Sequence, residues 1–216
     1  MKRTVIRMMD EASVLWSDQP YALKKGTTDW ISVSFSESRK RSREFAAWLV
    51  SKGFKKGDRL AILAEGSPEW IMAESGILCA ACVSVPLSIK LLAEEIPFRL
   101  DHSEARAILT TKNQLEKVLG SFAALKNKEM LLLYLDDDPA FARTTAAKFG
   151  LAPERVVGFD EAREAGRRAL ELQGSTLTAD LDAIAAAVEE DDTVNISYTS
   201  GTTGNPKGIM GKMKQI

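Results

Sequence analysis

The chain has 216 residues, of which 45% are hydrophobic and 27% charged, and its formal net charge is −1. This length suits one large domain or two small ones, and the composition is that of an ordinary globular protein rather than a disordered one. A nearly neutral charge gives no electrostatic reason to expect nucleic acid or an anionic membrane as a partner.

No segment has the pattern of an export signal or a membrane span. The longest apolar run, Ile77–Val83, is far shorter than the ~20 residues that a membrane span needs.

Cys79 and Cys82 form a C-x-x-C inside this run, which predicts buried packing rather than redox chemistry. A zinc site would need two further ligands, and the only histidine is His102, so no metal site is expected. Two cysteines and no export signal predict a cytoplasmic protein.

Helix-like and strand-like patterns alternate along the chain. Ser36, as an N-cap, and Ser67 followed by Pro68 are typical helix starts, and short apolar runs bounded by turn residues predict buried strands. The predicted strands are 59–64, 83–87, 107–110, 130–135, 155–159 and 193–198. The predicted helices are 36–53, 67–81, 94–103, 114–119, 181–188 and two exposed ones, 139–149 and 160–172.

Strands that are apolar throughout and alternate with helices are typical of one class of fold. They predict an α/β domain with a largely parallel sheet flanked by helices. No internal repeat, low-complexity tract or convincing linker interrupts the chain before Leu177, so a single domain is the simplest prediction.

The last predicted strand leads directly into a loop rich in Gly, Ser and Thr, Tyr198-Thr-Ser-Gly-Thr-Thr-Gly-Asn-Pro-Lys-Gly208. Gly201 and Gly204 let the backbone approach a ligand closely, and successive amides in such a loop can form an anion-binding nest. Four hydroxyl side chains and Lys207 add donors and a positive charge. These features indicate a polyphosphate site, although composition alone also allows a surface turn without a ligand.

This loop is not a Walker A motif, in which Gly-Lys is followed by Ser or Thr and opens a helix. Here Lys207 precedes Gly208, and the next residues, Ile209 and Met210, continue as a strand. A hairpin of strand, phosphate loop and strand is therefore predicted.

The order of apolar strand, Tyr-Thr-Ser-Gly-Thr-Thr-Gly and Pro-Lys-Gly resembles the signature of the adenylate-forming superfamily of acyl-CoA synthetases, nonribosomal adenylation domains and luciferases. The resemblance covers roughly 20–118 and 190–210 and is greatest to long-chain acyl-CoA synthetases. It implies the N-terminal subdomain of that fold, with residues 1–216 as a partial AMP-binding domain truncated after the phosphate loop. It also implies that the β- and γ-phosphates of ATP are bound by Thr199, Ser200, Gly201, Thr202, Thr203, Gly204 and Lys207.

The acyl-CoA synthetases of this superfamily join a carboxylic acid to AMP, release pyrophosphate and transfer the acyl group to coenzyme A. The resemblance therefore implies ATP with Mg²⁺, coenzyme A and a fatty acid as partners of an intact enzyme.

The chain departs from the family pattern at two places. Ala81 stands where many relatives have glycine, and 211–216 replaces a segment that leads to a histidine in relatives, so no catalytic residue is assigned. The acidic run 189–192 is interpreted as a solvated lead-in to a strand, and His102 as structural, without a pairing partner.

The family's downstream motifs are absent from the 216 residues. They include the adenine-binding strand, the acidic residue associated with magnesium, the ribose-binding aspartate and the C-terminal domain with its lysine. The chain is therefore expected to be a fragment that does not complete adenylation and holds ATP weakly or not at all. The alternative is a non-catalytic module that binds a partner or itself through an open sheet edge.

Overall fold

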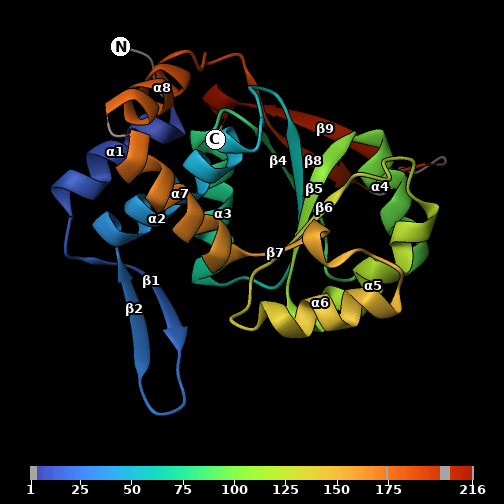
Figure 1. The fold of residues 1–216 in the computed structure, drawn as a ribbon. Helices are drawn as coiled ribbons and strands as arrows, with labels where there is room; N and C mark the ends of the chain where they lie inside the picture. The colour runs from blue at the N-terminus through green and yellow to red at the C-terminus, as the bar shows by residue number, and fades with distance from the viewer. Residues whose placement is uncertain (1–3, 174, 200–204, 216) are drawn as a thin grey trace.

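The computed structural model describes residues 4–173, 175–199 and 205–215, and its main element is a seven-stranded sheet between helices (Figure 1). The strand order is β7-β6-β5-β3-β4-β8-β9, and every neighbouring pair is parallel except β8 with β9. The predicted α/β class with a largely parallel sheet is confirmed. These strands are β3 (Arg59–Leu63), β4 (Val83–Pro86), β5 (Ala105–Thr110), β6 (Leu131–Tyr134), β7 (Val156–Gly158), β8 (Thr193–Thr199) and β9 (Lys207–Lys212).

The predicted helices are all present, the first before these strands and the others between them. They are α2 (Phe35–Ser51), α3 (Pro68–Cys79), α4 (Ile96–His102), α5 (Lys112–Ser121), α6 (Pro139–Lys148), α7 (Phe159–Gln173) and α8 (Ser175–Ala186). No element is predicted before residue 36, yet this part contains α1 (Val5–Leu15) and an antiparallel hairpin of β1 (Pro20–Lys25) and β2 (Trp30–Ser34). The hairpin projects from the body of the molecule (Figure 1). Within the described residues, no helix combines the length and apolar character that crossing a bilayer requires.

Alternate residues of the central strand β3 pack into two different layers. Leu60 and Ile62 belong to a core shared with α2, α3 and α7. Ala61 and Leu63 belong to a second core, shared with α4, α5 and α6. Because both faces of the sheet are covered, β3 is apolar at each position after Arg59.

Helix α2 begins earlier than the sequence predicts. Ser34, with φ −75° and ψ 165°, is the N-cap, and its Oγ accepts a hydrogen bond from the Glu37 amide at 3.2 Å. Ser36, the predicted cap, lies in the first turn, where its hydroxyl donates to the Ser17 carbonyl at 2.9 Å. Both serines suit a cap by residue type, and the extended backbone of Ser34 decides between them. The predicted stop near Gly53 is confirmed, since Gly53 follows the helix with φ 75°.

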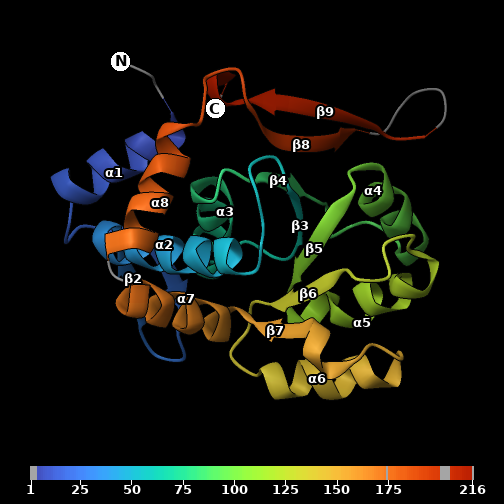
Figure 2. The ribbon, with the colours of Figure 1, turned by 45° about the horizontal axis from the view of Figure 1, so that its top comes forward.

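Helix α7 is not the exposed helix that was predicted. Phe159 and Ala162 on its inner side are 1% and 0% exposed, and they belong to the core that includes α2. Figure 2 shows α7 running alongside α2. Only a narrow stripe of this highly charged helix is apolar, and small residues in the stripe bring the two helices close together.

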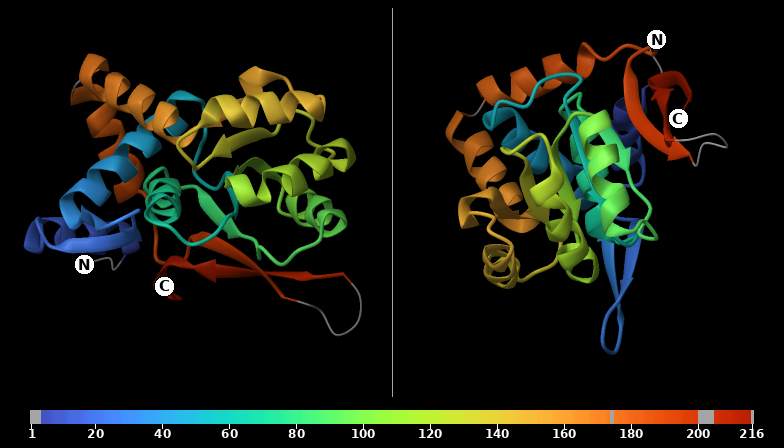
Figure 3. Two further views of the ribbon diagram at one scale, coloured as in Figure 1. Left: turned by 90° about the horizontal axis from the view of Figure 1, so that it is seen from below. Right: turned by 90° about the vertical axis from the view of Figure 1, so that its right-hand side faces the viewer.

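The last two strands form an antiparallel hairpin, as predicted. Their register runs from Thr193↔Lys212 to Thr199↔Lys207. In the described part of the chain, β8 joins the parallel sheet through one residue pair, Ser84↔Asn195 of β4 and β8. The long ribbon of β8 and β9 consequently extends past the body of the sheet (Figure 3).

Candidate functional site

The two ends of the predicted phosphate loop meet in the β8–β9 hairpin. Thr199 and Lys207 are paired across the two strands, and both are exposed. Directly opposite residues of an antiparallel pair project on the same face. We call them the closing pair. The other predicted members of the site, which lie outside the described residues, are Ser200, Gly201, Thr202, Thr203 and Gly204.

Lys207 is the positively charged member of the closing pair and is exposed. It forms no ion pair with a carboxylate among residues 4–173, 175–199 and 205–215. By contrast, Lys212 at the other end of β9 lies 3.1 Å from Asp191. Of the two lysines of β9, Lys207 is therefore the one whose charge no carboxylate of the described residues neutralises, and it could attract an anion.

The acidic run 189–192 is more than the solvated lead-in that was predicted. Asp191 pairs with Lys212 of β9, and Asp192 pairs with Lys56 at 2.5 Å. Such exposed ion pairs contribute little stability individually. Their effect here is geometric: the Asp191 pair joins the segment before β8 to the end of β9, and the Asp192 pair joins it to the turn before β3.

His102 has a partner, so its interpretation as an unpaired histidine is wrong. Its Nδ1 lies 2.9 Å from the hydroxyl oxygen of Tyr198, the residue before the closing pair. Its ring also stacks on Phe98, with ring centres 5.3 Å apart. His102 and Tyr198 are 96 positions apart, and no local sequence pattern relates them.

Gly208 lies opposite Tyr198 in the hairpin. A Cβ atom at this position would lie 3.1 Å from Ile196 Cγ2 and 3.5 Å from Tyr198 Cε1. A larger side chain would compete with the Tyr198 ring for this space. The glycine after Lys207 thus lets the tyrosine ring lie against the opposite strand.

The C-x-x-C pair is buried, as predicted, with Cys79 4% and Cys82 1% exposed. Burial raises the pKa of both thiols, that of Cys82 to about 12. Redox cysteines instead need a lowered pKa. The unpredicted feature is Arg39, which donates to Cys79 Sγ and, at 2.6 Å, to Asp10 Oδ1.

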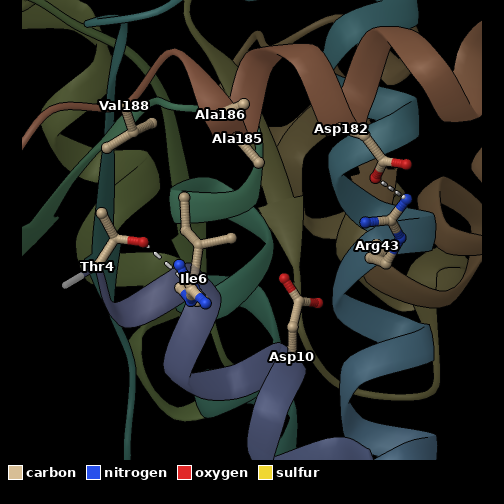
Figure 4. A pocket seen from close by; sticks show the side chains of 9 residues that line it. Thr4, Ile6, Asp10, Arg43, Asp182, Ala185, Ala186 and Val188 are labelled. Atoms are coloured by element: carbon tan, nitrogen blue, oxygen red, sulfur yellow. Dashed lines mark hydrogen bonds and ion pairs between the residues drawn. The ribbon is translucent and has the colours of Figure 1, made fainter. Parts of the chain in front are cut away.

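A cavity of about 450 Å³ lies between α1, α2 and α8 (Figure 4). Arg43 and Asp182 form an ion pair at 2.7 Å across it, and Asp10 is also part of its lining. Most of the remaining lining is apolar, and neither Thr199 nor Lys207 contributes to it. The cavity is a gap between packed helices and does not belong to the candidate site.

A sequence model of the family described as "AMP-binding enzyme" matches residues 9–216. The chain belongs to this family. A curated member, the long-chain-fatty-acid–CoA ligase of Salmonella typhimurium, is 27% identical over 222 aligned residues, which cover 96% of this chain and 36% of the relative. A propanoyl:CoA ligase of Rhodococcus jostii, whose acyl group carries an octahydroindene ring system, is 28% identical, with coverage of 91% and 38%. This member of the AMP-binding family thus spans less than half the length of these relatives.

The fold of this AMP-binding chain also matches solved structures. The A-PCP didomain of carboxylic acid reductase from Segniliparus rugosus, in complex with AMP, superposes with a TM-score of 0.75 at 19% identity. The match covers 98% of this chain and 32% of that one. The chain therefore has the fold of the corresponding part of an adenylate-forming enzyme.

Proposed function

We propose that residues 1–216 form part of the AMP-binding domain of an ATP-dependent fatty-acid–CoA ligase. The whole enzyme would convert an acid and ATP to acyl-AMP and pyrophosphate, and then transfer the acyl group to the thiol of coenzyme A. Support comes from the family match and from the fatty-acid ligase among the relatives.

The observation that carries this proposal is the closing pair, which is the last pair of the β8–β9 hairpin before the loop. Thr199 supplies a hydroxyl group and Lys207 an exposed ammonium group beside it. Donors arranged around a leaving pyrophosphate stabilise the charge that develops on it. In this proposal the phosphate-binding residues are Thr199, Ser200, Gly201, Thr202, Thr203, Gly204 and Lys207.

ATP, a fatty acid and coenzyme A are the proposed substrates of the whole enzyme. Mg²⁺ would accompany ATP as the counter-ion of its phosphates. Among the described residues, no group of three or more His, Cys, Asp and Glu side chains is arranged to hold a metal ion. We therefore assign no residue of this chain to Mg²⁺.

The chain alone is proposed to bind polyphosphate weakly and not to complete adenylation. It covers 36% and 38% of the length of the two curated relatives. Weak binding here means a Kd of about 1 mM or higher, which corresponds to a binding free energy no more favourable than about −4 kcal/mol.

The proposal is tested by titrating pyrophosphate into the chain and following the ³¹P chemical shift. Lys207→Ala should weaken binding at least about tenfold, because a charge-assisted hydrogen bond contributes about 1.5–3 kcal/mol. Lys212→Ala is the matched control: it removes the same charge from the same strand, at the end that pairs with Asp191. Equal losses in the two variants would indicate attraction by net charge and contradict a site at the closing pair.

A second candidate function is a module that binds a partner or a second copy of itself. Strand β9 is at the edge of the sheet, and its Ile209 and Met210 are 56% and 66% exposed. An unpaired strand edge with apolar side chains favours association. Concentration-independent sedimentation as a monomer would argue against self-association.

A further inference from the structure

Helix α4 holds the hydroxyl group of Tyr198 immediately before the closing pair. This hydroxyl donates to the Arg99 carbonyl oxygen at 3.2 Å and lies 2.9 Å from His102 Nδ1. The guanidinium carbon of Arg99 lies 5.9 Å from the centre of the Tyr198 ring. Tyr198 thus has both its polar end and its ring against one short helix.

One arrangement of protons makes both contacts of the Tyr198 hydroxyl hydrogen bonds. A tyrosine hydroxyl has one proton, and burial raises the pKa of Tyr198, so the proton is retained at neutral pH. If that proton is donated to the Arg99 carbonyl, the Tyr198 oxygen is free to accept a second hydrogen bond. Both contacts are then hydrogen bonds only in the tautomer in which His102 carries its proton on Nδ1 and donates it to Tyr198.

The other hydrogen bonds and ion pairs described between the hairpin and the rest of the chain lie at its base, the end away from the loop. In the described residues, β8 pairs with β4 only at Ser84↔Asn195, and the ion pairs of Asp191 and Asp192 are also at the base. Tyr198 is three residues further along β8 and faces Gly208, the neighbour of Lys207. Among the described contacts of the hairpin with the rest of the chain, the hydrogen bonds of Tyr198 with α4 lie nearest to the loop.

We propose that Arg99, His102 and Tyr198 form a latch that positions the closing pair Thr199–Lys207 for polyphosphate. This role rests on the proposed function of the closing pair, but the latch itself is a property of the chain without ligand. His102 and Arg99 are positioning residues, because they act through Tyr198 and not by contact with the phosphate.

The latch is tested first without ligand. His102 is the only histidine, so its imidazole signals in a ¹H–¹⁵N spectrum need no assignment. The expected result is a proton on Nδ1 in the neutral ring, with a shift of the Nδ1 resonance in Tyr198→Phe, which keeps the ring and loses the hydroxyl. An Nε2-protonated ring whose spectrum is unchanged by Tyr198→Phe would overturn the latch.

The positioning role is tested by pyrophosphate affinity. His102→Gln and Tyr198→Phe should each weaken binding about three- to tenfold, the range expected for one lost hydrogen bond. His102→Asn should keep near wild-type affinity, because the asparagine amide nitrogen lies near the position of Nδ1 and can donate the same hydrogen bond. A merely structural histidine would not distinguish Asn from Gln, so equal affinities of these two variants would overturn the role.

Failure of the latch and failure of the proposed function give different results. If the wild-type chain does not bind pyrophosphate while its histidine has the predicted tautomer, the phosphate site is refuted, and with it the positioning role. If pyrophosphate binds and depends on Lys207, yet Tyr198→Phe binds equally well, only the latch proposal fails. Thermal unfolding midpoints within a few degrees of wild type ensure that the variants compared are folded.

Discussion

Replacing Gly166 with alanine is expected to lower the free energy of unfolding by about 3 kcal/mol or more, an unusually large effect for one methyl group. Helix α7 contacts α2 at this glycine, and an added Cβ would lie 1.9 Å from the Glu44 carbonyl oxygen and 2.9 Å from the Trp48 amide nitrogen. Both obstacles are backbone atoms, which cannot rotate away as a side chain can. The two helices would have to separate, and the ion pair between Arg163 and Glu44, now at 3.3 Å, would be lost.

Chemical denaturation of Gly166→Ala and Gly120→Ala measures this effect against a matched control. Gly120 also lies in a helix, α5, and a Cβ there would meet nothing within 4 Å. Alanine is the better helix former by about 1 kcal/mol, so Gly120→Ala should be neutral or stabilising. A stable Gly166→Ala variant would contradict the close contact between α2 and α7.

Removing the carboxylate of Asp10 is expected to destabilise the chain by about 2 kcal/mol. Arg39 is 6% exposed, and its Nε donates to Asp10 Oδ1 at 2.6 Å. Breaking a fully buried pair costs about 3–5 kcal/mol, and the half-exposed Asp10 side chain reduces this cost. The penalty arises because Asp10→Ala leaves the Arg39 guanidinium buried without its counter-ion.

Glu11→Ala is the control, since Glu11 is the next residue of α1 and pairs with Arg7 in an exposed position. It should cost less than about 0.5 kcal/mol. The double variant Asp10→Ala/Arg39→Met should recover part of the lost stability, because it removes the buried charge as well. Equal unfolding free energies for Asp10→Ala and Glu11→Ala would show that the Asp10–Arg39 pair contributes little.

The sheet could be predicted because its strands are buried on both faces. The runs 60–64 and 130–135 are apolar at every position. Ser67-Pro68 is a typical helix start, and Ser67 does cap α3, accepting from the Trp70 amide at 3.1 Å. The hairpin form of the phosphate loop could also be predicted, since Ile209 and Met210 do not open a helix.

Other features depend on contacts that have no local pattern. The inner stripe of α7 is defined by its approach to α2, and the latch joins residues nearly a hundred positions apart. The hairpin of β1 and β2 is largely exposed, so it has no apolar alternation to signal it. The backbone conformation of Ala81 also has no local sequence signal. Its φ of 54° lies in the left-handed region, which explains why glycine suits this position.

The central claim is that the closing pair Thr199–Lys207 is part of a polyphosphate site, and ³¹P spectra of MgATP titrated with the chain test it most directly. The β- and γ-phosphate resonances should shift or broaden more than the α-phosphate resonance, and Lys207→Ala should abolish the difference. Spectra in which the three resonances are unaffected, or in which wild type and Lys207→Ala behave alike, would contradict the account.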